Sequence, residues 1–351
     1  MSANANSYIY AHTSGTISKA DPVRVRFTQS IASEEEIGEK VNKGIISFSP
    51  RIKGTATWEN DRTLLFTPSE HWQSGTNYVT SVKLKNLFEN VPSDATIVEF
   101  DFQTIEMAFD VKMKALNAVS NSDLSKQELE GSIVVSDIAD NQQVEKLLTA
   151  SQNNKGLSIR WNHLDNGIEH VFFVGDIIRG DDDGEVVLSW KGSPIGAATK
   201  GTKNYAVPSI NNFKIMSADA IREGDQSISL YFSDPILPNQ NLNGLITIED
   251  YNSQLRYDIN GTEVKVFPST RLVGSHKVIV RPGIKNVNDF KMRDRSEWNL
   301  SFEDIKPQIR LVGEGVVMPN SNGLVFPFES VSLKAVAVSY THLTLPTILL
   351  V

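Results

Sequence analysis

The densest group of side chains that could bind an ion is a run of carboxylates, Asp181-Asp182-Asp183-Gly184-Glu185. A calcium loop needs oxygen ligands at alternating positions over about a dozen residues, closed by a distal bidentate carboxylate. This run lacks that spacing and lies between two segments that alternate like strands. We interpret it as a solvated hairpin tip whose Asp-Gly pair makes the turn, and weak calcium binding stays open as the alternative.

Two histidines, His163 and His170, flank an Asn166-Gly167 pair and could approach each other across a hairpin. Two imidazoles with Asp165 nearby would suit a metal ion or an acid–base pair. No third ligand stands at a recognisable spacing. The pattern favours a surface hairpin that carries two ordinary imidazoles.

Two other groups of residues are better explained by structure than by chemistry. The acidic run Glu34-Glu35-Glu36 follows Ser33, which suits a helical turn with a serine N-cap and carboxylates near the positive end of its dipole. Tryptophans are spread along the chain as core aromatics would be, whereas a sugar-binding platform needs two or three on one exposed face. The five are Trp58, Trp72, Trp161, Trp190 and Trp298.

No spacing of the GxSxG, HExxH, P-loop or GxGxxG type stands out. The sequence therefore predicts no catalytic residue, no cofactor-binding residue and no metal ligand, and we expect that the chain is not an enzyme. It contains no cysteine, which excludes disulfides, cysteine nucleophiles, zinc ribbons and iron–sulfur clusters within these residues.

Length, charge and hydrophobicity exclude further classes of protein. The 351 residues leave room for about two to three and a half domains. Lys and Arg number 34 against 42 Asp and Glu, a net charge of −8, which makes a poor nucleic-acid binder. No apolar run approaches the roughly 18 residues of a membrane span. The first fifteen residues have no basic and apolar regions of a signal peptide, so a cytosolic protein and a chain that starts after its export signal both remain open.

The elements that must carry these residues are strands. Val23, Val25 and Phe27 alternate with polar residues, the period of a half-buried strand. Similar runs separated by turns predict antiparallel sandwiches, and they cover residues 45–49, 63–68, 77–84 and 97–105. One amphipathic segment, 141–151, is a helix candidate. Asn166-Gly167 and Asn260-Gly261 predict tight hairpins, because Asn-Gly supplies the positive φ angles that such turns need.

The first hundred residues recur about 200 positions later, which predicts repeated units. The matching pairs are 23–31 with 228–236, 45–50 with 245–250, 62–68 with 263–268, 75–82 with 274–280, and 99–105 with 299–305. Proline at the junctions suits linkers. We predict an all-β chain of tandem immunoglobulin-like or macroglobulin-like antiparallel sandwiches, with units at 1–106, 107–207 and 208–307 and the start of a macroglobulin domain at 308–337.

The last fourteen residues, 338–351, break this pattern. Their sequence VSYTHLTLPT is similar to the translation of a sequencing-library transposase adapter. We therefore expect the natural protein to continue beyond Ala337 in place of this tail.

Three segments resemble the N-terminal region of bacterial α2-macroglobulins, particularly Bacteroidetes lipoproteins. They are residues 8–27, 63–84 and 323–338. The resemblance, which extends over residues 8–337, implies a large periplasmic or cell-envelope protein that traps proteases. In that family a protease cuts a bait region, the molecule collapses, and a thioester in a Cys-x-x-Gln type motif can bond the attacker. Because this chain has no Cys, it would be the N-terminal structural arm, and proteases would meet downstream regions.

The resemblance also implies a lipid anchor, although neither the lipoprotein signal nor its cysteine is present here. Two other classes stay open. One is a surface adhesin or glycan-binding lipoprotein built from bacterial immunoglobulin-like modules, which exposed aromatics on a module edge would favour. The other is an enzyme whose catalytic domain was lost by truncation, which would leave these residues as its accessory sandwiches.

Overall fold

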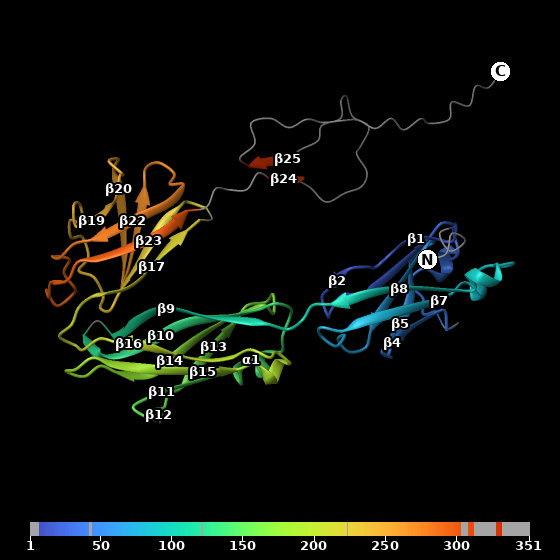
Figure 1. Cartoon of the computed structure of the whole chain (residues 1–351), viewed down its shortest axis with the longest axis horizontal. Helices are drawn as coiled ribbons and strands as arrows, with labels where there is room; N and C mark the ends of the chain where they lie inside the picture. Colours follow the sequence, from blue (N-terminus) through green and yellow to red (C-terminus); the bar gives the residue numbers. More distant parts are fainter. Residues whose placement is uncertain are drawn as a thin grey trace, which may run out of the picture.

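The computed structural model describes residues 7–41, 44–120, 122–222 and 224–302, together with the backbone of 308–311 and 328–331. Within these residues the chain folds into three β-sandwiches that follow one another along the sequence (Figure 1). The expected all-β class of tandem antiparallel sandwiches is confirmed. Each sandwich encloses its own cluster of buried hydrophobic side chains.

The first sandwich has one sheet of strand order β1-β3-β6-β5 and a second of order β2-β8-β7-β4. The alternation of buried and exposed residues along the strands explains how the two sheets pack. In β8 every second residue is buried, and in β3 the three apolar residues are buried whereas the two arginines between them are exposed. The strands are β1 (Ile9–His12), β2 (Thr16–Ile17), β3 (Val23–Phe27), β4 (Ile46–Ser49), β5 (Gly54–Asn60), β6 (Thr63–Pro68), β7 (Asn77–Lys83) and β8 (Ile97–Thr104).

The second sandwich has sheets of order β13-β14-β10-β9 and β12-β11-β15-β16. Its strands are β9 (Phe109–Ser120), β10 (Asp123–Val135), β11 (Leu148–Gln152), β12 (Lys155–Gly156), β13 (Ile159–His163), β14 (Glu169–Ile178), β15 (Gly184–Lys191) and β16 (Lys200–Val207). The only α-helix among the described residues, α1 (Asn141–Glu145), connects β10 to β11.

The third sandwich has sheets of order β17-β18-β21-β20 and β19-β22-β23. Its first sheet has the same order as β1-β3-β6-β5, and the similar sequences of β3 and β18, and of β6 and β21, occupy the same places. Its strands are β17 (Ile215–Ile221), β18 (Ser227–Phe232), β19 (Ile246–Ile248), β20 (Leu255–Asn260), β21 (Glu263–Pro268), β22 (Gly274–Val280) and β23 (Ser296–Phe302).

Two short strands follow the third sandwich. Strands β24 (Gln308–Leu311) and β25 (Phe328–Val331) pair antiparallel. The rest of the fourth unit expected at 308–337, the boundary near 306–307 and the tail at 338–351 lie outside the described residues.

The helix expected over 141–151 is shorter than its pattern suggested. Asp140 caps α1 by accepting from the N–H of Gln143, and the helix ends at Glu145. From Leu148 the chain enters β11, whose buried and less buried residues alternate and whose backbone pairs with β15. Pairing in a buried sheet outweighs helix propensity in so short a segment.

The two Asn-Gly pairs do form hairpins, but by a different turn from the one expected. Only the glycines have positive φ, +64° at Gly167 and +58° at Gly261. The side chain of Asn166 instead accepts from the N–H groups of Ile168 and Glu169, at 2.9 and 3.1 Å. Asparagine thus stabilises this turn through its side chain, as in Asx-turns.

Candidate functional site: the joints between the sandwiches

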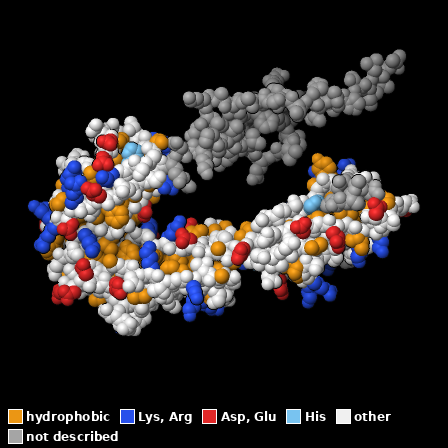
Figure 2. All heavy atoms as spheres, in the orientation of Figure 1, with side chains coloured by type: hydrophobic (Ala, Val, Ile, Leu, Met, Phe, Trp, Pro, Cys, Tyr) orange, Lys and Arg blue, Asp and Glu red, His pale blue; other side chains and the backbone are white. Residues whose placement is uncertain are grey.

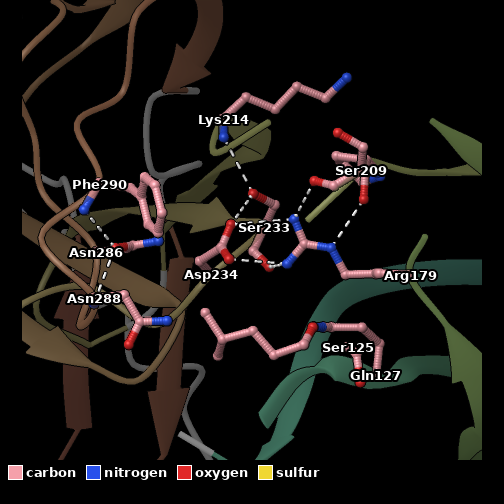
Figure 3. A network of polar contacts seen from close by, with 12 residues as sticks. Ser125, Gln127, Arg179, Ser209, Lys214, Ser233, Asp234, Asn286, Asn288 and Phe290 are labelled. Carbon is pink, nitrogen blue, oxygen red and sulfur yellow. Dashed lines mark hydrogen bonds and ion pairs between the residues drawn. The ribbon is translucent and has the colours of Figure 1, made fainter. Parts of the chain in front are cut away.

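The most deeply buried ionic group in the described residues joins the second sandwich to the third. Arg179, which follows β14, lies against Asp234, which follows β18, with Nη1 to Oδ1 at 2.9 Å (Figure 3). Both side chains are fully buried. A buried ion pair is stable only where hydrogen bonds satisfy its remaining polar atoms. The groups around Arg179 and Asp234 therefore determine which segments of the chain the pair connects.

Arg179 uses every N–H that a guanidinium offers. Besides Asp234, it donates to the carbonyls of Pro208 at 2.8 Å, Ser209 at 2.7 Å and Ser233 at 3.3 Å. Pro208 and Ser209 form the link from β16 toward the third sandwich. The hydroxyl of Ser233 donates to Asp234 at 2.6 Å and accepts from the N–H of Lys214. One side chain of the second sandwich therefore holds both the linker and the third sandwich.

Asp183 makes a second, more exposed attachment beside it. Its carboxylate accepts from the N–H of Ser209 at 2.6 Å and from the side-chain amide of Asn212 at 3.2 Å. The Ser209 N–H, followed by the Asn212 amide, holds the pKa of Asp183 below its usual value. The joint is therefore polar at its rim as well as at its centre.

The sandwiches also meet along their sheets. All six residues of β18 are buried, although only Ile228, Leu230 and Phe232 belong to the hydrophobic core of the third sandwich. Strand β9 of the second sandwich lies against β17 and β18. Nearby, the hydroxyl of Thr262 donates to Asn117 at 2.5 Å. The residues of β18 that point away from its own core are thus buried where the two sandwiches meet.

The joint between the first and second sandwiches has a buried carboxylate of its own. Asp137 is 2% exposed and accepts from the Ser18 hydroxyl at 2.5 Å, the Lys19 N–H at 2.7 Å and the Ile138 N–H at 2.8 Å. Two of these three donors come from the first sandwich. Hydrogen bonds to a charged acceptor are about twice as strong as neutral ones, so Asp137 fastens the loop that contains Ser18.

That loop is held in turn by the core of the first sandwich. Trp72 is 1% exposed, its N–H donates to the Lys19 carbonyl at 2.9 Å, and its indole N–H donates to the Asp21 carbonyl at 2.7 Å. Its ring contacts four other aromatic rings, with centroids 4.9–5.9 Å apart, those of Phe48, Phe66, Tyr78 and Phe102. The core thereby fixes the position of the loop that meets Asp137.

The carboxylate run 181–185 is not the hairpin tip that its sequence predicted, because β14 and β15 belong to different sheets. Asp181, Asp182 and Asp183 lie in the exposed connection between the two sheets, and Gly184 and Glu185 begin β15. Of its three aspartates, Asp183 belongs to the joint between the second and third sandwiches, which we call the second joint; the first joint is the one between the first and second sandwiches.

The described residues contain no group of three or more His, Asp or Glu side chains placed to hold a metal ion. The joint residues Arg179, Asp234 and Asp137 carried no motif that sequence reasoning could detect.

The structure also places the histidine pair, the acidic turn and the tryptophans that the sequence singled out. His163 and His170 do meet across the β13–β14 hairpin, with Nδ1 to Nδ1 at 2.8 Å. They are not the surface imidazoles that the pattern predicted, because His170 is fully buried and His163 is half-buried. Ser33 caps the short helical turn Glu34–Glu36, donating from its N–H to the carboxylate of Glu36 at 3.0 Å. All five tryptophans are buried or half-buried, in agreement with their interpretation as core residues.

The face shown in Figure 2 carries basic and acidic side chains interspersed over all three sandwiches. Within the described part of the chain, no helix is both long enough and apolar enough to cross a membrane.

Residues 1–87 match the family model of a bacterial Ig domain. The chain is a tandem of Ig-like β-sandwiches. A second comparison finds an "Alpha-2-macroglobulin homolog" of Yersinia pestis, 36% identical over 69 residues. That match covers 20% of this chain and 3% of the length of the Yersinia protein, so it shows similarity to one segment of a much longer relative.

Solved structures with related folds include surface layer protein SbsC, domains 4–9, at a TM-score of 0.32 and 10% identity, over 86% of this chain and 48% of that one. Invasin, a bacterial integrin-binding protein, matches at a TM-score of 0.22 and 13% identity, over 90% and 62%. L,D-transpeptidase 3 from Mycobacterium tuberculosis matches at 0.21 and 15%, over 35% and 44%. At these scores the similarity carries no argument about function.

Proposed function

We propose that this chain is the N-terminal structural arm of a bacterial α2-macroglobulin-like protease trap in the cell envelope, and that it is not itself an enzyme. The observation that carries the proposal is the 36% identity to an α2-macroglobulin homolog over 69 residues. Ig-like sandwiches in a row suit an arm, because each folds on its own core and adds length.

The joints support the same proposal. A flexible string of modules would be connected by solvated linkers, whereas here each junction has a nearly or fully buried carboxylate bonded to the neighbouring sandwich. The arm would hold the regions that follow it at a fixed position. Its partners would be neighbouring domains of the same protein, and the trapped protease would meet those domains and not the arm.

The test begins with the chromosomal gene, read without interruption beyond codon 337. We expect an open frame that encodes a bait segment and a downstream Cys-x-x-Gln motif. The purified full-length protein, mixed with an equimolar general protease, should suppress cleavage of a large protein substrate. It should leave cleavage of a small peptide substrate largely intact, since a trapped protease keeps its active site.

Two controls accompany this assay. Residues 1–337 alone should be soluble, β-rich and without effect on the protease, because the trapping regions are absent. Replacing the motif cysteine in the full-length protein should abolish any covalent adduct seen by mass spectrometry. A downstream hydrolase or glycan-binding domain, or stoichiometric inhibition by residues 1–337 alone, would refute the proposal.

A further inference from the structure

The third sandwich repeats the arrangement of the first. Its sheets β17-β18-β21-β20 and β19-β22-β23 correspond to the strand orders β1-β3-β6-β5 and β4-β7-β8. A glycine with positive φ stands at or just before the start of both β7 and β22, with +63° at Gly75 and +81° at Gly274. A surface that the first sandwich uses can therefore be located on the third.

The first sandwich binds its neighbour through one end. The segment between β1 and β3 presents Ser18 and Lys19 to Asp137 of the second sandwich. The chain also leaves the first sandwich here, since the Gly75 N–H donates to the carbonyl of Ile105, the residue after β8, at 3.0 Å. The first joint is thus made by the end from which the chain continues, which we call the exit end.

The exit end of the third sandwich is held together in the same way as that of the first. It consists of residues 221–222, 224–226, 254–257 and 267–274 and the end of β23. In the first sandwich the N–H of the buried Trp72 donates to the Lys19 carbonyl. In the third, the N–H of the buried Leu272 donates to Oε1 of Gln226 at 2.7 Å, and Nε2 of Gln226 donates to the Leu272 carbonyl at 3.0 Å. Both loops of this end are therefore fixed by the sandwich itself.

This exit end carries exposed apolar side chains. Ile221, the last residue of β17, is 38% exposed, and Val273, which precedes the Gly274–Phe302 pair of β22 and β23, is 54% exposed. Arg222 donates from Nη2 to the Ser301 carbonyl at 3.0 Å, so the end of β17 lies beside the last residues of β23. Exposed apolar side chains at the point where the chain continues favour an interface.

A hollow of about 740 Å³ opens at the same end of the sandwich. Arg256 and Arg271 line it together with Asp225, and neither arginine makes an ion pair with a described residue. At the second joint, by comparison, Arg179 binds Asp234 of the sandwich that follows. Because a guanidinium matches the geometry of a carboxylate, the two arginines of the hollow suit an acidic side chain.

The length of the connection determines which part of the protein lies nearest. Strand β23 ends at Phe302 and β24 begins at Gln308, so only residues 303–307 separate them. Six residue steps of fully extended chain span about 20 Å at most. The unit that begins at β24 must therefore start close to the exit end.

We propose that the exit end of the third sandwich is the docking surface for the unit that follows in the same chain and begins at β24. That unit covers Ile221 and Val273, and one of its carboxylates binds Arg256 and Arg271. The inference deepens the proposed function, because it names the surface through which the arm positions the regions downstream. It rests on that proposal only for the continuation of the chain beyond residue 337.

Cysteine alkylation tests the proposal, because these 351 residues contain no cysteine of their own. Val273→Cys is placed in the full-length protein and in residues 1–307, and mass spectrometry of the labelled peptide separates it from any downstream cysteine. We expect alkylation to be at least about tenfold slower in the full-length protein, where docking must open before the thiol reacts. Val119→Cys in the second sandwich, at a position 65% exposed, should react at the same rate in both.

Three substitutions in the full-length Val273→Cys background make the result specific. Ile221→Asp should raise the alkylation rate several-fold, because it places a charge under the docked unit. Arg271→Gln should raise it as well, because the carboxylate loses its partner. Val119→Asp should leave it unchanged. Thermal unfolding of residues 1–307 with each substitution confirms that the three sandwiches still fold.

Three outcomes would overturn the proposal. They are equal alkylation of Val273→Cys in the two proteins, a rate that neither Ile221→Asp nor Arg271→Gln changes, and protection that disappears on dilution, which would assign the surface to a second copy of the chain. The downstream sequence decides the protease-trap function separately. A downstream hydrolase with a protected Val273→Cys would refute the trap and support the docking surface.

Discussion

Replacing Arg179 with methionine is expected to lower the free energy of unfolding by about 3–5 kcal/mol, the usual cost of removing one partner of a buried ion pair. The substitution would leave Asp234 charged and fully buried without its partner, and it would free the carbonyls of Pro208 and Ser209. Urea denaturation measures the loss. Hydrogen exchange should assign it to peptides on both sides of the second joint.

An exposed pair of the same chemistry provides the control. Arg24 lies 3.1 Å from Glu59, with side chains 51% and 38% exposed, so Arg24→Met should cost less than about 1 kcal/mol. Arg179→Met combined with Asp234→Leu should recover part of the lost stability, because the uncompensated charge is gone. If Arg179→Met costs no more than Arg24→Met, the buried pair does not hold the joint.

Replacing Trp72 with alanine should destabilise the first sandwich by about 3–5 kcal/mol, as expected for deleting a large aromatic side chain from a core. The ring is 1% exposed and packs against four aromatic rings. Its loss would also release the loop of residues 18–21 that Asp137 fastens. Thermal unfolding measures the stability, and energy transfer across the first joint measures the release.

Two further substitutions separate packing from hydrogen bonding. Trp72→Phe keeps an aromatic ring but loses the indole N–H that reaches the Asp21 carbonyl, so it should cost less than the alanine variant yet still loosen the joint. Tyr10→Ala removes a ring that is 71% exposed and should change stability by less than about 1 kcal/mol. Equal costs for Trp72→Ala and Tyr10→Ala would contradict this view of the core.

The sheets could be predicted because the alternation of apolar and polar residues along a strand indicates which of its side chains face the core. Val23, Val25 and Phe27 are buried and the arginines between them are exposed, as the alternation indicated. The sequence pattern gave a wrong prediction where contacts with other parts of the fold determine the local structure. Leu148 to Ser151 were predicted as the end of a helix, but they pair with β15 and form a strand. Asn166 stabilises its turn through its side chain.

The joints could not be predicted, because they depend on single residues far apart in sequence. Arg179 and Asp234 are 55 positions apart, and Ser18 and Asp137 are 119 apart. Each is an ordinary polar residue until the fold buries it. The histidine pair is an intermediate case: its hairpin was predictable, but the contact between His163 and Glu145 depended on where α1 ends.

The central claim is that buried contacts hold the three sandwiches as one arm at neutral pH. Double electron–electron resonance between spin labels tests it most directly, with Thr67→Cys and Thr149→Cys across the first joint and Thr149→Cys and Asp258→Cys across the second. All three positions are exposed, and the chain has no competing cysteine. At about pH 7.5, above the histidine range, we predict one narrow distance distribution for each pair, with only the second broadened by Arg179→Met. A broad distribution across either joint in the unmodified background would contradict the account.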